Sequence, residues 1–242
     1  MRSINCNQNY KNLYRSFHRL EKTAPCAFRL WRELLTVNSK EYTGFPAHSC
    51  SVEGHKIATH FKDFITPFLK GRILDVGCGP QPLPLYLEGY SLNKIWGIDP
   101  ISEPRDHPFC FKKGVAEFLP LRRDFFDVVI AATSLDHVFL LDKAYSEIYR
   151  VVKKNGFFLA WLAFVKGAEY YNPHGEKIKP ADEYHLFHFD KPWFEESFKK
   201  YFTIEKVVIT NFEIDHYFYC LKPRSYWEFI KNNVRNRWNS KF

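Results

Sequence analysis

The stretch that decides the fold is Ile73-Leu74-Asp75-Val76-Gly77-Cys78-Gly79-Pro80. Its first half has the apolar character of a short buried strand, and the two glycines that follow let the backbone turn sharply. A ligand can approach such a turn closely because no Cβ stands in the way. We expect a helix led by Pro80 to follow, with free N–H groups at its start. Together these features are typical of a nucleotide-type loop.

An acidic residue at the end of the next apolar run strengthens this interpretation. Asp99 follows the run Lys94–Ile98 and lies twenty residues after Gly79. At that spacing a carboxylate can accept hydrogen bonds from both hydroxyls of a ribose. The loop and the acid together therefore predict a ligand that contains adenosine.

Short apolar runs around this motif predict the strands of a sheet. They lack polar alternation, which is typical of strands covered on both faces, as in a parallel sheet. The runs are Arg72–Val76, Lys94–Ile98, Asp127–Ala132 and Phe157–Phe164. Two further candidates, Thr203–Thr210 and Ile214–Leu221, are joined by so short a turn that they must pair antiparallel.

Amphipathic segments before and between these runs predict helices. Apolar residues recur at helical spacing within 10–20, 55–69, 142–152 and 193–202. In the third segment, Asp142 is placed to cap the helix and Lys154-Asn155-Gly156 to end it. We therefore predict an α/β fold, a doubly wound, mostly parallel seven-stranded sheet with a reversed C-terminal edge hairpin, plus N-terminal helices.

Composition and charge narrow the class of protein. With 45% apolar and 26% charged residues, the chain resembles an ordinary globular protein with a real core. No apolar run is long enough to span a membrane and no secretory signal is visible, so we expect a cytoplasmic protein. The six cysteines stand singly, which predicts neither a disulfide framework nor a zinc ribbon. The net charge of +8 belongs to the two ends of the chain, whereas the middle is slightly acidic.

Four segments in this order resemble the motifs of the class I S-adenosylmethionine-dependent methyltransferases, in particular their small-molecule "type 11" branch. The segments are ILDVGCGP (73–80), GIDP (97–100), GVAEFLPLRRDFFDVVIAATSLDHV (114–138) and VVKKNGFFLAW (151–161). The resemblance covers roughly residues 70–165, and four ordered motifs are far more specific than one. It implies that the chain is a methyltransferase and that its cofactor is S-adenosyl-L-methionine.

The resemblance also implies roles for individual residues. Gly77, Cys78 and Gly79 would line the methionine part of the cofactor, and Asp99 would hold the ribose. Asp75 would help to order the loop near the methionine amino group. The remaining members of the cofactor set are Ala116 and Glu117 at the adenine edge and Thr133 after the strand of the fourth motif.

The expected organisation has three parts. They are a helical N-terminal extension and lid (1–70), the methyltransferase domain (71–222) and a basic amphipathic tail (223–242). The resemblance implies a lid in the loop-like Glu41–Ser51, which contains Tyr42, Phe45 and His48, and chance placement of these three residues is the equal alternative. The tail segment Tyr226–Trp238 combines aromatic and basic residues, and packing on its own domain is favoured over an anionic membrane surface or a partner.

His137 is the candidate catalytic residue. Methyl transfer from a sulfonium needs an oriented nucleophile, and a hydroxyl nucleophile must also lose its proton. Asp136-His137 directly follows a predicted strand, at the sheet edge where α/β folds bind ligands. An imidazole titrates near neutral pH, so His137 is suited to act as the general base. The alternative is that this histidine packs over the cofactor or caps a helix.

The long connection 166–191 is expected to form the wall of the acceptor site. Tyr184, His185 and His188 are its candidate substrate-binding residues. With Asp182 the two histidines would supply three metal ligands. We nevertheless predict no metal, because imidazoles that face a polar pocket are commoner.

The sequence thus predicts methylation of a small or carbohydrate-like acceptor, most simply at a hydroxyl. Nucleic acid is not expected, because the Asn/Asp-Pro-Pro-aromatic motif of base methyltransferases is absent after the fourth-motif strand. Pro82 stands where a nicotinamide dehydrogenase would have its third glycine. An RNA methyltransferase and a non-catalytic cofactor-binding subunit remain the alternatives. The sequence does not predict an oligomeric state.

Overall fold

The computed structural model describes residues 6–44, 56–103, 106–212 and 214–225. Its helices and strands are, in order, α1 Cys6–Thr23, α2 Pro25–Gly44, α3 Lys56–Ile65, β1 Ile73–Val76, β2 Ile95–Asp99, β3 Cys110–Lys113, β4 Phe126–Ala132, α4 Leu141–Val151, β5 Val152–Ala163, α5 Lys191–Phe198, β6 Phe202–Phe212 and β7 Ile214–Pro223. In these ranges three α-helices come first, four strands follow without an α-helix between them, and helices and strands alternate only from β4 to β6. None of the helices within the described residues is long and apolar enough to cross a bilayer.

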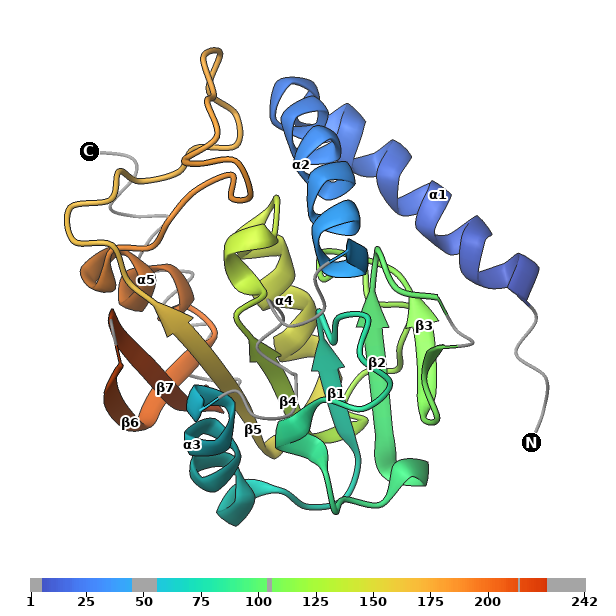
Figure 1. The fold of residues 1–242 in the computed structure, drawn as a ribbon, viewed down its shortest axis with the longest axis vertical. Coiled ribbons are helices and arrows are strands. Elements are labelled where there is room, and N and C mark those ends of the chain that lie inside the picture. Colours follow the sequence, from blue (N-terminus) through green and yellow to red (C-terminus); the bar gives the residue numbers. More distant parts are fainter. Residues whose placement is uncertain (1–5, 45–55, 104–105, 213, 226–242) are drawn as a thin grey trace.

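The strands form one seven-stranded sheet in the order β3-β2-β1-β4-β5-β7-β6 (Figure 1). The five strands from β3 to β5 run parallel, whereas β7 pairs antiparallel with both β5 and β6. The predicted mostly parallel sheet with a reversed C-terminal hairpin is therefore confirmed. Because β1 lies between β2 and β4, the chain changes direction across the sheet there, and such a switch point leaves a crevice at the carboxyl ends of the strands.

Both faces of the sheet are covered, which explains the uninterrupted apolar runs. Ile73 of β1 and Val128 and Ile130 of β4 face the core that contains α3. Leu74 of β1 and Val129 of β4 face the larger core that contains α4, α5 and the N-terminal helices. In Figure 1, α1 and α2 lie across the end of the sheet toward which β1 and β2 point.

The helix expected after Gly79 does not form, and that prediction is wrong. Residues 80–84 have no regular structure, and only a short 3-10 turn at Leu85–Leu87 follows (η3). Proline disfavours helical backbone in the residue before it, so Gln81 and Leu83 are both biased toward extended conformations. Pro84 itself lies at ψ 136°, outside the helical region.

The ends of the other predicted helices differ in detail. Leu140, not Asp142, is the N-cap of α4, and no side-chain capping bond is made there. Lys154-Asn155-Gly156 lie in an irregular part of β5, where the register with β4 shifts. The helix predicted over 55–69 gives way to a 3-10 turn at Thr66–Phe68, which contains Pro67.

Three expectations fall on segments that the structure does not describe. Phe45 and His48 of the expected lid and the tail segment Tyr226–Trp238 lie outside the described residues. The strand β3 and the long helix α2 are described but were not predicted as separate elements. The sequence of β3 lacks an uninterrupted apolar run, and that of α2 lacks a clean amphipathic stripe.

The packing of α3 generates a stability prediction. Phe61 is fully buried and its ring lies 5.3–5.4 Å from those of Tyr86, Trp161 and Phe218. Phe61→Ala should lower the free energy of unfolding by about 3–5 kcal/mol, because the α3 core loses contacts and gains a cavity. Urea denaturation measures this. Tyr14→Ala, at a side chain that is 75% exposed, is the matched control and should stay within about 0.5 kcal/mol of the parent.

Candidate functional site

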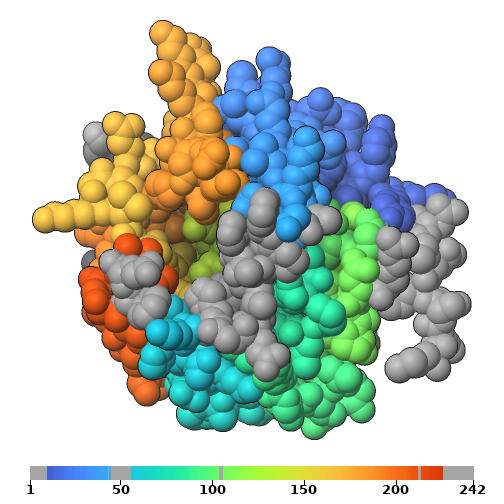
Figure 2. Space-filling model, viewed as in Figure 1, coloured from blue at the N-terminus to red at the C-terminus, as the bar shows by residue number. Residues whose placement is uncertain are grey.

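A cavity of about 520 Å³ opens at the carboxyl ends of β1, β2 and β4. Its volume is typical of sites that hold a small molecule or a cofactor. Residues of α2 and of the connection between β5 and α5 close it from two sides. The space-filling view shows a hollow between the blue helical segment and the orange connection (Figure 2).

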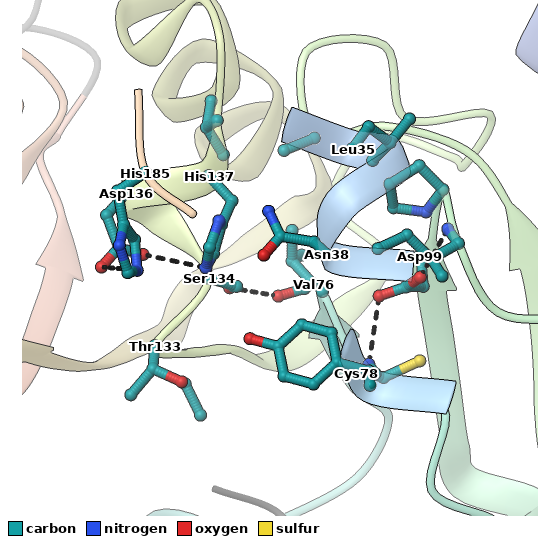
Figure 3. A pocket seen from close by; sticks show the side chains of 18 of the residues that line it. Leu35, Asn38, Val76, Cys78, Asp99, Thr133, Ser134, Asp136, His137 and His185 are labelled. Carbon is teal, nitrogen blue, oxygen red and sulfur yellow. Dashed lines mark hydrogen bonds and ion pairs between the residues drawn. The ribbon is translucent and has the colours of Figure 1, made fainter. Parts of the chain in front are cut away.

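The glycine loop is held in a shape that other residues cannot adopt. Gly77 and Gly79 have φ angles of +74° and +69°. A Cβ on Gly77 would lie 2.4 Å from the Cβ of Ser134. The Ser134 hydroxyl donates to the carbonyl of Val76 at 2.7 Å, so the ends of β1 and β4 are joined directly (Figure 3).

Cys78 contributes its backbone to the loop, not its thiol. The side chain is 1% exposed and lies against β2, since a Cβ on Gly97 would come within 2.8 Å of the Cys78 sulfur. Burial raises the pKa of the Cys78 thiol well above its usual range. The thiol is therefore unsuited to be a nucleophile.

Asp99 lies at the end of β2 and is 6% exposed. Its Oδ1 accepts hydrogen bonds from the backbone N–H groups of Ile101 and Ser102 and from the Ser102 hydroxyl. Among the described residues, Oδ2 accepts only the N–H of Gly79, at 3.1 Å (Figure 3). One oxygen thus orders the loop that follows β2, and the other retains capacity for a ligand hydroxyl.

Glu117 and Ala116 line the cavity on the side of β3. Oε1 of Glu117 accepts the backbone N–H groups of Phe139 and Leu140 at 2.9 and 3.0 Å. Burial raises the pKa of Glu117, and these N–H groups partly oppose the shift. Glu117 therefore satisfies donors just before α4, the task that the sequence assigned to Asp142.

Asp75 does not reach the cavity, in contrast to the other residues predicted for the cofactor. It lies within β1, is fully buried, and accepts the hydroxyl of Tyr86 at 2.9 Å. Its other oxygen, Oδ1, is buried and has no hydrogen-bond partner within the part of the chain that the structure describes. Burial raises the pKa of Asp75 to about 7. Its link to the site passes through Tyr86, which does line the cavity.

Thr133 follows β4 and also lines the cavity. Its φ of +48° is unusual for a residue with a branched Cβ and marks local strain. The backbone N–H donates to the carbonyl of Trp161 at 2.9 Å, which holds this conformation. The strained turn directs the chain toward Asp136 and His137.

His137 lies at the cavity wall with Asp136 and His185 (Figure 3). Burial lowers the pKa of His137 below its usual range, and the carboxylate of Asp136 partly offsets this shift. The rings of His137 and His185 are stacked, with centroids 4.6 Å apart. His137 Nε2 lies 4.0 Å from Oδ1 of Asp136. This oxygen is buried and has no hydrogen-bond partner from any described residue.

The three predicted acceptor residues are not equivalent. Tyr184 and His185 line the cavity, whereas His188 does not. His188 lies instead against Asp182, with its Nε2 3.0 Å from Oδ2 of that residue.

Sequence reasoning missed the part of the wall that α2 provides. Trp31 donates its indole N–H to the carbonyl of His137 at 2.9 Å, and Asn38 donates to the carbonyl of Tyr184 at the same distance. Tyr42, which was expected in the lid, lies at the end of α2 and lines the cavity. No motif marks these residues, because their roles arise from contacts more than a hundred positions away.

The described cavity wall contains acidic side chains without lysine or arginine. Asp99, Glu117 and Asp136 line the cavity, and no lysine or arginine is among its described lining residues. A ligand that carries positive charge, such as a sulfonium and an ammonium, fits these surroundings, whereas a phosphate finds no cation to pair with. S-adenosyl-L-methionine therefore fits the loop and the charge of the cavity.

Comparisons with known proteins agree with this geometry. Residues 74–160 match a family model described as a methyltransferase domain. No curated protein matches the sequence. Among solved structures, the PH0226 protein from Pyrococcus horikoshii OT3 has 18% identity and a TM-score of 0.56, over 76% of this chain and 99% of the other.

Two further solved structures are similar in fold. An S-adenosylmethionine-dependent methyltransferase from Clostridium acetobutylicum has 13% identity and a TM-score of 0.53, over 78% of this chain and 99% of the other. The 1,6-didemethyltoxoflavin-N1-methyltransferase from Burkholderia thailandensis has 12% identity and a TM-score of 0.62, over 80% and 88%. The family resemblance stated from the motifs is confirmed.

The raised pKa of Asp75 generates a prediction about pH. Between the unfolded pKa of about 3.9 and the folded pKa of about 7, the folded state holds a proton that the unfolded state has lost. The free energy of unfolding should therefore fall as the pH rises through this window. Asp75→Asn keeps an acceptor for Tyr86 and should flatten the fall, by at most about 1.4 kcal/mol per pH unit.

Urea denaturation from pH 5 to 8 measures both slopes. The variant should match the parent near pH 5 and exceed its stability near pH 8. Identical slopes in the two proteins would show that Asp75 is not the group that titrates.

Proposed function

We propose that this chain, whose residues 74–160 are an S-adenosylmethionine-dependent methyltransferase domain, methylates a hydroxyl of a small, carbohydrate-like acceptor that carries no phosphate. The observation that carries the proposal is the composition of one enclosed cavity. The cavity brings together the glycine loop, the carboxylate of Asp99, which is assigned to the ribose, and the imidazole of His137. No lysine or arginine is among its described lining residues.

The cofactor end of the cavity is assigned to the loop after β1 and to Asp99. The cofactor supplies an activated methyl group on a sulfonium. The loop backbone at Gly77 and Gly79 gives the methionine part room, and Oδ2 of Asp99 accepts a ribose hydroxyl. Because Oδ1 is occupied by internal donors, we expect one strong contact to the ribose from this residue in place of two.

The acceptor end is assigned to His137, His185 and Tyr184. A neutral imidazole can take a hydroxyl proton, and the lowered pKa keeps His137 neutral at physiological pH. When His137 gains the proton, the nearby carboxylate of Asp136 stabilises the imidazolium. Trp31 holds the backbone of His137, so the ring is positioned by α2 as well as by the loop after β4.

The acceptor class follows from what the wall offers. Trp31 and Trp161 line the cavity together with Tyr184 and His216, and this mixture of aromatic and hydrogen-bonding residues suits the apolar faces and hydroxyls of a sugar. Trp161 donates its indole N–H to Nδ1 of His216, so the other nitrogen of His216 carries the proton. A nucleic acid would need cations for its phosphates, and the described wall supplies none.

The Burkholderia enzyme of similar fold is named for methylation at a nitrogen, so nitrogen acceptors belong in the experiment. Release of S-adenosylhomocysteine should be measured over matched pairs, each a neutral sugar or phenol and its phosphate ester, together with amines and RNA. Turnover of a neutral hydroxyl compound, with none of its phosphate ester, is expected. Turnover confined to amines, to phosphate esters or to RNA would contradict the proposal.

Asp99→Ala tests the cofactor end. Loss of a charge-assisted contact of about 1.5–3 kcal/mol should weaken cofactor binding by about one to two decades. Calorimetry with S-adenosylhomocysteine measures it. Ser102→Ala removes an internal bond to the other oxygen of Asp99 and should change the affinity no more than a few-fold. Unchanged affinity in a folded Asp99→Ala variant would remove Asp99 from the site.

His137→Ala tests the general base. Turnover should fall by about 10²–10⁴-fold, while the affinity for S-adenosylhomocysteine stays within a few-fold of the parent. In the parent, kcat/KM should rise with pH through a group that titrates below about 6.5 and then level off, since the base must be unprotonated. The acidic limb should vanish in the variant.

Two outcomes would contradict this role. A larger loss of turnover in His185→Ala than in His137→Ala would place the base on the connection between β5 and α5. Loss of cofactor affinity in parallel with turnover would make His137 a packing residue.

A further inference from the structure

The connection between β5 and α5 spans residues 164–190 without helix or strand. It nevertheless supplies Tyr184, His185 and Leu186 to the cavity wall. Its course is fixed on one side by Phe187, which is buried and stacks on Tyr171 at 4.6 Å. The stretch that faces the cavity needs a second constraint, because a segment without regular hydrogen bonds has much conformational freedom to lose.

Three potential metal ligands converge within this stretch. Asp182 Oδ2 lies 2.9 Å from His185 Nδ1 and 3.0 Å from His188 Nε2. One ligand atom from each of the three residues can be chosen so that all lie within 4.8 Å of one another. Around an ion with bonds of 2.0–2.1 Å, neighbouring ligand atoms are about 3 Å apart at right angles and about 3.4 Å apart at tetrahedral angles. The separations of the two imidazole nitrogens from Asp182 Oδ2 therefore match the spacing of ligand atoms around a bound ion.

Backbone hydrogen bonds fix the orientation of the Asp182 carboxylate. Its Oδ1 accepts the N–H groups of Tyr184 and His185 at 2.8 and 2.7 Å, which holds the carboxylate in place. Oδ2 is thereby directed at both imidazoles. The second histidine, His188, lies three residues after His185.

We propose that Asp182, His185 and His188 bind one first-row transition-metal ion, of the class of Zn²⁺, and that this ion orders the acceptor wall. Two imidazoles and one carboxylate suit such an ion, whereas Mg²⁺ and Ca²⁺ prefer oxygen ligands alone. Water completes the coordination, since the side chains of Asp182 and His188 are 38% and 29% exposed. The proposal does not depend on methyl transfer.

The other group that could hold an ion fits less well. Asp136, His137 and His185 also gather three ligand atoms, but His185 Nε2 and His137 Nε2 are 3.9 and 4.0 Å from the carboxylate oxygens. These separations exceed the spacing around a bound ion. His185 is shared by both groups, and it presents Nδ1 to Asp182 and Nε2 to Asp136.

That shared position gives Asp136 a different role. A histidine that ligates a metal usually directs its second ring nitrogen at a carboxylate, which fixes the orientation of the ring. Asp136 stands in that place for His185. The ion would therefore hold the His185 ring against His137, at the stacking distance of 4.6 Å, and so connect the wall to the cavity.

Calorimetry with Zn²⁺ tests the site on the full chain, stripped with a chelator and kept reduced. One ion per chain should bind the parent. His188→Ala and Asp182→Ala should each weaken Zn²⁺ binding by about 10²-fold or more, beyond the 10–100-fold typical of outer-shell changes. His174→Ala, at an exposed histidine of the same connection, is the matched control and should bind as the parent does.

Thermal unfolding in the presence of a chelator shows whether a variant has lost only a metal ligand or has also lost folding stability. His188→Ala and the stripped parent should melt at the same temperature, and Zn²⁺ should raise the melting temperature of the parent alone. Trypsin offers a second measurement, because Lys166 and Lys177 are exposed on this connection. Zn²⁺ should slow cleavage at these lysines in the parent and not in His188→Ala.

Three outcomes would overturn the proposal. Absence of one-to-one binding would leave the cluster as two imidazoles that donate to a carboxylate. Binding lost in His137→Ala but kept in His188→Ala would place the ion at the other group. Equal cleavage with and without bound Zn²⁺ would refute the ordering of the wall.

Discussion

The hydrogen bond from the Ser134 hydroxyl to the carbonyl of Val76 joins the carboxyl ends of β1 and β4, and the rest of the site depends on how these two ends meet. It is possible only because residue 77 is a glycine, since a Cβ there would lie 2.4 Å from Ser134. The contact forces the loop after β1 into left-handed backbone. It also sets the start of the segment that carries Asp136 and His137. One steric constraint thus places the cofactor loop and the candidate base on the same cavity.

Buried carboxylates organise the walls around this junction. Asp99 orders the loop after β2 through three donors to one oxygen, and Glu117 does the same for the residues before α4. Each replaces lost hydration with backbone N–H groups, which is how a buried acid is tolerated. Asp75 differs, because one of its oxygens has no hydrogen-bond partner among the described residues. Burial raises the pKa of both Asp75 and Glu117.

The cavity is closed by elements that lie outside the sheet. The prolines after Gly79 prevent a helix there, so the loop is followed by irregular backbone and a short 3-10 turn. Closure comes instead from α2, which bonds to His137 and Tyr184 through Trp31 and Asn38. The acceptor side thus depends on two segments, α2 and the connection after β5, whose mutual packing positions the histidines.

The sequence by itself determined six of the seven described strands, the glycine loop and the cofactor class, because these are set by local patterns. Apolar runs report burial directly, and Gly77, Gly79 and Asp99 follow from backbone geometry and spacing. Only the tertiary structure decided that no helix follows Pro80, that Asp75 lies beneath the cavity, and that His188 turns to Asp182. It alone revealed α2 as a wall, because Trp31 meets His137 across more than a hundred residues and no local pattern encodes such a contact. Burial and hydrogen-bond partners are properties of the folded packing, so they cannot be predicted from the sequence alone.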